Sequence, residues 1–167
     1  SLSIFMYTCI YTPLKSLTPL SVFVGAFPGA IPFMLGWVAA TGSFGIEPGL
    51  LFMIQFFWQF PHFWAIGWIM DDDYKKAGFK MLPTGNPNRA TAFQIVFYTF
   101  WTIIISITPF TQYSGDLSLS LEAVVVLILI GIYFLYHALI LMQKRTKDAA
   151  RKLMYASITY ISILQIT

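Results

Sequence analysis

Residues 123–143 read AVVVLILIGIYFLYHALILMQ and contain no Asp, Glu, Lys or Arg. An α-helix needs roughly 20 predominantly apolar residues to cross the hydrocarbon core of a bilayer. This uncharged stretch of 21 residues meets that requirement by length and by composition. It therefore predicts a transmembrane helix.

Uncharged runs recur along the chain. The others long enough to cross a bilayer are residues 16–46, 48–70 and 90–115. We accordingly expect four complete spans, near residues 18–41, 50–70, 91–111 and 122–143. Residues 1–14 and 153–167 are also uncharged but short, and we expect two truncated spans there. The predicted fold is an all-α, multi-span transmembrane helix bundle that forms a single transmembrane domain over residues 1–167.

The overall composition points to the same class. The chain is 57% hydrophobic and only 10% charged, whereas a soluble domain carries about 25% charged residues. A solvated surface cannot be built from so few charges, which argues against a soluble domain. The chain starts at Ser1 inside an apolar stretch that lacks a basic region, so we expect a C-terminal fragment and not a signal peptide. The lone Cys9 excludes an internal disulfide.

The basic residues fall on alternate connections between the predicted spans. They are Lys15, then Lys75, Lys76, Lys80 and Arg89, then Lys144, Arg145, Lys147, Arg151 and Lys152. The intervening connections, 42–49 and 112–122, hold acidic residues and no Lys or Arg. Because basic loops mark the cytoplasmic face, the Asp-rich loop 71–89 is predicted to be cytoplasmic. This placement also explains the net charge of +3 without a nucleic-acid partner.

The predicted span 18–41 contains a GxxxG pair and two prolines. Gly25 and Gly29 form the pair, which allows a neighbouring helix to approach closely. Pro28 and Pro32 remove backbone donors and predict a kink. Two interpretations stay open, either tight helix packing alone or a kink that shapes a cavity.

Three polar residues share one face of the predicted span 50–70. Gln55, Gln59 and His62 are spaced i, i+4 and i+7, which aligns them on a helix. Such residues serve either as hydrogen-bonded contacts between helices or as the lining of a substrate cavity. In the second case His62 would act as a proton relay or a metal ligand.

Three consecutive carboxylates, Asp71–Asp73, follow that span and are followed by Lys75 and Lys76. Adjacent carboxylates repel one another unless a cation lies near them. Mg²⁺ takes one or two carboxylates together with substrate phosphates, and the lysines could bind the remaining phosphate charge. The alternative is an ordinary solvated acidic turn.

Four motifs in order resemble the heme-farnesylating branch of the UbiA prenyltransferase superfamily. They are Tyr11-Thr-Pro-Leu-Lys15, then Gly25-Ala-Phe-Pro-Gly-Ala-Ile-Pro32 with Gly36-Trp37, then Trp58-Gln-Phe-Pro-His-Phe63, then Asp73-Tyr74 with Ala77-Gly78 and Met81-Leu-Pro83. Ala150-Arg-Lys-Leu153 and Ala156-Ser157 are weaker similarities. The resemblance implies helices around a central cavity, with a first Asp-rich motif upstream of this chain. It also implies transfer of a farnesyl group from farnesyl diphosphate to the vinyl group of heme b.

The resemblance further implies roles for individual residues. Asp73 and Asp72 would hold Mg²⁺ and the diphosphate, and Lys15 and Lys76 would contact phosphate. Ser16 follows Lys15 where the family usually has Arg, which leaves that contact open. The predicted substrate contacts are His62, Gln59, Gln55, Tyr11, Tyr74 and Trp58, and the predicted apolar lining is Phe56, Phe60 and Trp64.

The expected setting is the bilayer of a bacterial inner membrane, or alternatively of the mitochondrial inner membrane. A downstream heme-modifying enzyme or a terminal oxidase assembly is an expected partner. One alternative function is a UbiA-type enzyme with another aromatic or tetrapyrrole acceptor. A second, from a different class, is a secondary transporter with a broken helix at Pro28 and Pro32.

Overall fold

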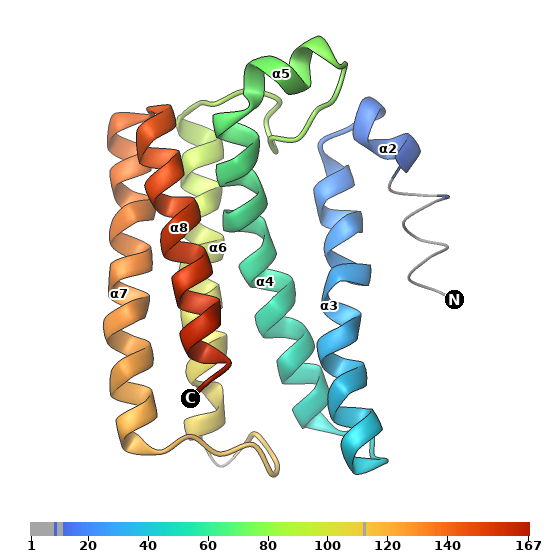
Figure 1. Ribbon diagram of the computed structural model, residues 1–167, viewed down its shortest axis with the longest axis vertical. Helices are drawn as coiled ribbons and strands as arrows, with labels where there is room; N and C mark the ends of the chain where they lie inside the picture. The colour runs from blue at the N-terminus through green and yellow to red at the C-terminus, as the bar shows by residue number, and fades with distance from the viewer. Residues whose placement is uncertain (1–8, 10–11, 112) are drawn as a thin grey trace.

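The computed structural model describes residue 9 and residues 12–111 and 113–167, and these form helices joined by short connections (Figure 1). The helices are α2 (Thr12–Leu17), α3 (Leu20–Thr41), α4 (Ile46–Ile69), α5 (Asp71–Lys76), α6 (Arg89–Ile107), the 3₁₀ turn η2 (Thr108–Phe110), α7 (Leu121–Lys144) and α8 (Lys147–Leu164). The described residues contain no strand. The predicted all-α fold is therefore confirmed.

Polar side chains cap the N-termini of the later helices. Asn88 and Ser120 accept hydrogen bonds from the backbone N–H of Thr91 and Ala123, at the starts of α6 and α7. Thr146 does the same at the start of α8. Each cap satisfies a backbone donor that has no partner within the helix. These caps fix where the loops end and the apolar helices begin.

Four of the long helices pack in a closed ring. α4 packs against α6, α6 against α7, α7 against α8, and α8 against α4. The ring encloses large buried side chains, among them Trp68, Phe134 and Tyr160. α3 lies outside the ring and packs on α4 (Figure 1). α4 is therefore the shared helix between the ring and α3.

The contact between α3 and α4 uses the GxxxG face. Gly25 is buried, and Gly29 faces Gln59 so closely that a Cβ at position 29 would collide with the Gln59 side chain. The Nε2 atom of Gln59 donates to the carbonyl of Ala26 at 3.2 Å. α3 is one continuous helix through Pro28 and Pro32. The broken helix required by the transporter alternative is therefore not observed.

Three helices are long and apolar enough to cross a membrane among the residues that the structure describes. They are Leu20–Thr41, Arg89–Phe110 and Leu121–Lys144. The predicted span 50–70 is a helix of 24 residues, α4, which is roughly 36 Å long at 1.5 Å per residue. Its length suffices for a span, but it is not among the three. Gln55, Gln59 and His62 interrupt its apolar sequence, and many of its residues are buried.

The helices alternate in direction, so the basic connections gather at one end of the bundle. The α2–α3 turn, the α5–α6 loop and the α7–α8 connection lie at this end (Figure 1). The α3–α4 and α6–α7 connections lie at the other end, where Glu47 accepts a hydrogen bond from the backbone N–H of Asp116 at 3.0 Å. The predicted alternation of charge is therefore present in the fold. Long apolar helices with charges confined to their ends indicate a multi-pass membrane protein.

Candidate functional site at the α4–α8 seam

Polar contacts follow the seam where α4 and α8 run antiparallel. Asp72, just beyond the end of α4, contacts Lys147 at the start of α8. Ten residues before Asp72 in α4 and ten residues after Lys147 in α8, His62 contacts Ser157. At 1.5 Å per residue, roughly 15 Å of helix separates these two contacts. The seam thus joins a charged helix end to a half-buried imidazole in the apolar part of the bundle.

His62 is held against α8 together with Trp58. The Nδ1 atom of His62 lies 2.8 Å from Oγ of Ser157. The indole Nε1–H of Trp58 donates to the Ser157 carbonyl at 2.7 Å. The two rings stack with centroids 4.7 Å apart and planes inclined by 15°. Both predicted substrate contacts are therefore oriented by one residue of α8.

The two glutamines on the same side of α4 face different surroundings. Gln59 is buried and donates to the carbonyls of Ala26 and Gln55, so it acts as a contact between helices α3 and α4. Gln55 is also buried, and its Oε1 atom has no hydrogen-bond partner among the residues that the structure describes. It lines a cavity of about 170 Å³ between α3, α4 and α8, together with Ile54 and Ile161. Each of the two interpretations of these polar residues thus applies to one of the glutamines. Gln59 is a contact between helices, and Gln55 faces a cavity.

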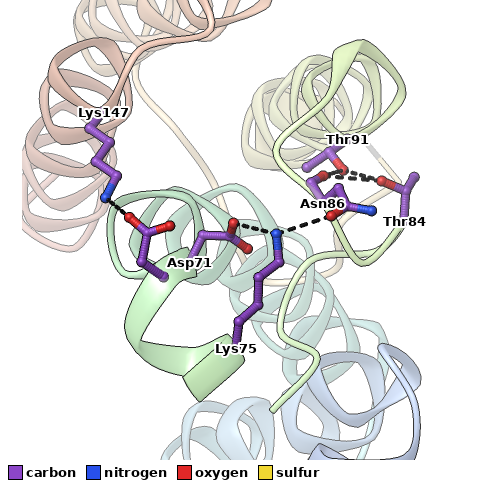
Figure 2. Close-up of polar contacts among 7 residues, drawn as sticks. Asp71, Lys75, Thr84, Asn86, Thr91 and Lys147 are labelled. Carbon is purple, nitrogen blue, oxygen red and sulfur yellow. Dashed lines mark hydrogen bonds and ion pairs between the residues drawn. The ribbon is translucent and has the colours of Figure 1, made fainter. Parts of the chain in front are cut away.

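The acidic cluster forms a short helix, α5, and not the loop expected from the sequence. Asp71 is buried, and its Oδ2 atom lies 2.7 Å from Nζ of Lys75. Lys75 also donates to Oδ1 of Asn86 at 3.0 Å, and the Asn86 carbonyl accepts from Thr84 and Thr91 (Figure 2). Asp71 therefore ties α5 to the loop that precedes α6. A solvated acidic turn does not describe this residue.

Asp72 and Asp73 are exposed, and each faces a lysine. The Nζ atom of Lys147 lies 2.6 Å from Oδ2 of Asp72 (Figure 2). The hydrogen bond from this ammonium group, followed by its positive charge, lowers the pKa of Asp72 below its ordinary value of 3.8. Lys76 lies farther from Asp73, at 3.8 Å. Asp73 is thus the carboxylate of the cluster with the loosest ion pair.

The donor set fits part of a divalent-cation site. Exposed carboxylate oxygens are hard ligands, and Mg²⁺ needs only one or two of them when substrate phosphates supply the others. No group of three or more His, Cys, Asp or Glu side chains converges in the part of the chain that the structure describes. Asp72 and Asp73 can therefore hold a cation jointly with a phosphate-bearing ligand, and Asp71 is occupied by Lys75.

The loop between α5 and α6 lines an open hollow of about 540 Å³ at the same end of the bundle. Lys75, Lys80 and Asn86 line it, together with Pro19 from the turn after α2. α2 carries Lys15, so this predicted phosphate contact belongs to the charged end. Tyr74 is half-buried on α5, with its ring 6.5 Å from Phe79. Tyr11 lies outside the described residues.

The predicted aromatic lining is not on the face that carries His62. Phe60 and Trp64 line a separate cavity of about 270 Å³ with Tyr98 of α6. Phe56 packs among the aromatic rings of α3 and α4, including Phe27 at 4.9 Å. Two residues along a helix correspond to a rotation of roughly 200°, which places Phe60 across α4 from His62. Phe60 and Trp64 therefore line a cavity on a different side of α4 from His62, and their role as an apolar lining stays a prediction.

Sequence reasoning missed Lys147, Asn86 and the role of Ser157 as a contact. Lys147 begins α8, where a cation is disfavoured by the positive end of the helix dipole. That position is a sequence signal for a nearby carboxylate. The contact of Asn86 with Lys75 depends on how the loop folds back, and it has no comparable signal.

The structure is a multi-pass membrane helix bundle with carboxylates and lysines at one end and an imidazole on the α4–α8 seam below them. The chain belongs to the UbiA prenyltransferase family, which matches residues 1–162. It is 63% identical over 166 residues to the protoheme IX farnesyltransferases of Christiangramia forsetii and Flavobacterium johnsoniae. Each alignment covers 99% of this chain and 55% of the relative.

A more distant relative carries the same name. The protoheme IX farnesyltransferase of Cytophaga hutchinsonii is 44% identical over 99% of this chain and 57% of its own length. The chain thus spans about half the length of the curated relatives it matches. No solved structure matches the chain.

Proposed function

We propose that the protein containing this chain transfers the farnesyl group of farnesyl diphosphate to the vinyl group of heme b, giving heme O and diphosphate. The names of the relatives support this assignment. The observation that carries it is the seam between α4 and α8, which has carboxylates at the charged end and His62 below them. A divalent cation on the carboxylates would bind a diphosphate, and an imidazole is a common ligand of heme iron.

Asp73 and Asp72 are proposed to hold the diphosphate through a divalent cation, for which we propose Mg²⁺. The cation would neutralise the charge that develops on the departing diphosphate. Lys76 is highly exposed and free to turn from Asp73 toward a phosphate oxygen. Lys15, at the same end of the bundle, is the second proposed phosphate contact. Tyr74 and Tyr11 are the proposed contacts at the substrate entrance.

The reaction breaks the bond between C1 of the farnesyl group and the diphosphate oxygen, and diphosphate leaves with the electron pair. The terminal vinyl carbon of heme b then bonds to C1. Water adds to the remaining cationic carbon and loses a proton, which completes the hydroxyethylfarnesyl group. Ile54 and Ile161 line the cavity between α3, α4 and α8. They would limit the access of other water molecules to the carbocation.

His62, Trp58, Gln59 and Gln55 are proposed to lie on the heme side. Trp58 and His62 provide flat ring surfaces held rigidly by Ser157. Gln55 supplies a buried oxygen that has no hydrogen-bond partner within the described part of the chain. Gln59 is proposed to act through the placement of α3, because both of its hydrogen bonds go to backbone carbonyls.

The proposed location is a bacterial inner membrane, with residues 71–89 on the cytoplasmic side. The basic connections at that end of the bundle support this orientation. These helices are proposed to form one transmembrane domain, the C-terminal part of the whole protein. Heme O would pass to a heme-modifying enzyme or to a terminal oxidase assembly.

The test uses the full-length protein with Asp73→Asn, and Asp116→Asn at the opposite end of the bundle as the control. Heme O is measured by chromatography of extracted hemes, across a Mg²⁺ titration, at matched protein levels in the membrane. Asp73→Asn should abolish heme O formation, because loss of a metal ligand removes several kcal/mol of transition-state stabilisation. Asp116→Asn should retain full activity.

His62→Ala in the same assay distinguishes the two sides of the site. It should lower heme O formation and change the dependence on heme b, while the dependence on Mg²⁺ stays as in the wild type. Normal yield and normal activity of Asp73→Asn would mean that α5 has a structural role and does not hold the cation. Farnesylation of another aromatic or tetrapyrrole acceptor in preference to heme b would favour the alternative UbiA-type enzyme.

A further inference from the structure

The hydrogen bonds of Ser157 determine which nitrogen of His62 carries a proton. The Oγ atom of Ser157 lies 2.6 Å from the carbonyl oxygen of Met154, one turn earlier in α8. A carbonyl oxygen only accepts, so the single hydroxyl proton of Ser157 points to Met154. Two acceptor oxygens at this distance without a proton between them would repel each other. The hydroxyl of Ser157 is thereby left as an acceptor toward its other neighbour.

That other neighbour is Nδ1 of His62, at 2.8 Å. Since Ser157 accepts in this contact, Nδ1 carries the proton and donates it. The neutral ring then holds its lone pair on Nε2. The network therefore fixes one tautomer of His62.

The orientation of the imidazole is fixed as well. Trp58 covers one face of the ring, and its own N–H is bound to the Ser157 carbonyl. Ser157 thus accepts a hydrogen bond from each of the two α4 side chains. Its hydroxyl accepts from His62, and its carbonyl accepts from Trp58. No hydrogen bond from the described part of the chain reaches Nε2, and His62 is only half-buried. The lone pair of Nε2 therefore has a fixed direction and meets no hydrogen-bond donor among the described residues.

A histidine that donates Nδ1–H to an oxygen and leaves Nε2 free has the arrangement of a metal-binding imidazole. A free metal ion would need more ligands, and no group of three or more His, Cys, Asp or Glu converges within the described residues. A heme differs, because the porphyrin supplies the equatorial nitrogens and the protein adds only an axial ligand. For an iron porphyrin, the single imidazole of His62 is sufficient as the protein ligand.

We propose that Ser157 is a positioning residue that holds His62 as the Nδ1–H tautomer, so that Nε2 binds the iron of heme b as an axial ligand. This inference rests on the proposed function, since it takes heme b as the substrate. Iron ligation at His62 would place the porphyrin on the seam beneath Asp72 and Asp73. Roughly 15 Å of helix separates the Asp72–Lys147 contact from the His62–Ser157 contact. The diphosphate and the reacting vinyl group would occupy the part of this length that the rest of the porphyrin leaves free.

The experiment titrates purified full-length protein with heme b and follows the absorption and electron paramagnetic resonance spectra of the bound heme. The wild type should show a histidine-ligated heme. His62→Gly should lose this signature, and added imidazole should restore it, which would demonstrate that the variant is folded. Ser157→Ala should weaken heme b binding about tenfold, the lower range for loss of a residue that orients a metal ligand.

Ser157→Thr should retain the wild-type spectrum and affinity, because it keeps the hydroxyl group. Thr159→Val is the matched control. The Thr159 hydroxyl also bonds to a carbonyl of α8, that of Tyr155 at 3.0 Å, and the residue is exposed. Thr159→Val should leave the spectrum and the affinity unchanged.

Bound heme b whose spectrum is the same in the wild type and in His62→Gly would overturn the inference, even if heme O is formed normally. Equal heme b affinity of Ser157→Ala and the wild type would overturn the positioning role. Failure of the proposed function has a different signature. In that case His62 ligates heme b and Ser157→Ala weakens its binding, but no heme O is formed from farnesyl diphosphate.

Discussion

The Nζ atom of Lys147 lies 2.6 Å from Oδ2 of Asp72, although 75 positions separate the two residues in the chain. This ion pair connects the first residue of α8 to the acidic helix α5. Its partners come from two different connections at the charged end of the bundle. The carboxylate proposed to hold a cation is therefore neutralised by a lysine of the protein when no cation is present.

Lys147→Gln should raise the pKa of Asp72 toward its ordinary value of 3.8. The hydrogen bond from Lys147 lowers this pKa in the folded protein, so the pair stabilises the fold at neutral pH. That contribution is lost as the pH falls below 3.8 and through the lowered pKa of the folded state. Carbon-13 NMR of labelled Asp carboxyl groups in detergent, with Asp72→Asn for assignment, measures the change.

Lys152→Gln serves as the control for this measurement, since Lys152 pairs with Asp148 on α8. It should leave the titration of Asp72 as it is in the wild type. An Asp72 pKa that does not respond to Lys147→Gln would show that the contact is absent in the membrane protein.

Asp71→Asn and Asp73→Asn should affect different properties of the protein. Asp71 is buried and bound to Lys75, so its replacement should destabilise the fold by about 1–2 kcal/mol through loss of a charge-assisted hydrogen bond. Asp73 is exposed, and its replacement should leave stability within about 0.5 kcal/mol. Thermal unfolding in detergent, followed by circular dichroism, separates the two, and equal melting temperatures would contradict the assignment.

Gly29→Ala should weaken the contact between α3 and α4. The new methyl group would displace the end of the Gln59 side chain and break its hydrogen bond to Ala26. A buried hydrogen bond of this kind contributes about 1 kcal/mol. In a Gln59→Ala background the same substitution should cost less, because the obstacle is gone. Additive effects in this double-mutant cycle would mean that the two residues do not interact.

The two ends of the bundle should be accessible from opposite sides of the membrane. In a Cys9→Ser background, Lys80→Cys should react with an impermeant thiol reagent only from the cytoplasmic side. Asp116→Cys should react only from the other side, because the connections that carry these residues lie at opposite ends of the bundle. Labelling of both variants from the same side would invalidate the topology.

The helices were largely predictable, because a bilayer demands long uncharged runs and the basic connections fix their alternation. The functions of neighbouring polar residues were harder to predict. Gln59 and His62 share a face of α4, yet that face borders α3 on one side and α8 on the other. Only tertiary packing reveals this division.

The acidic cluster shows the same limit. Asp71, Asp72 and Asp73 are adjacent and chemically identical, so their sequence gives no basis for separating them. Their environments differ because the partner of Asp71 lies on α5 itself, whereas the partner of Asp72 comes from α8. The choice of Asp73 as the principal ligand remains a prediction, and its looser ion pair is compatible with that role.

The closed ring of α4, α6, α7 and α8 has a consequence for biosynthesis. Each of these helices finds two neighbours within the ring, so the ring can assemble from segments that leave the ribosome one after another. α3 is joined to it by a short exposed connection, residues 42–45, and by the GxxxG face. If the chain is divided within residues 42–45 and its two parts are synthesised from separate genes, the contact surfaces of α3 and α4 stay intact. The two parts therefore retain the surfaces required to reassociate in the membrane.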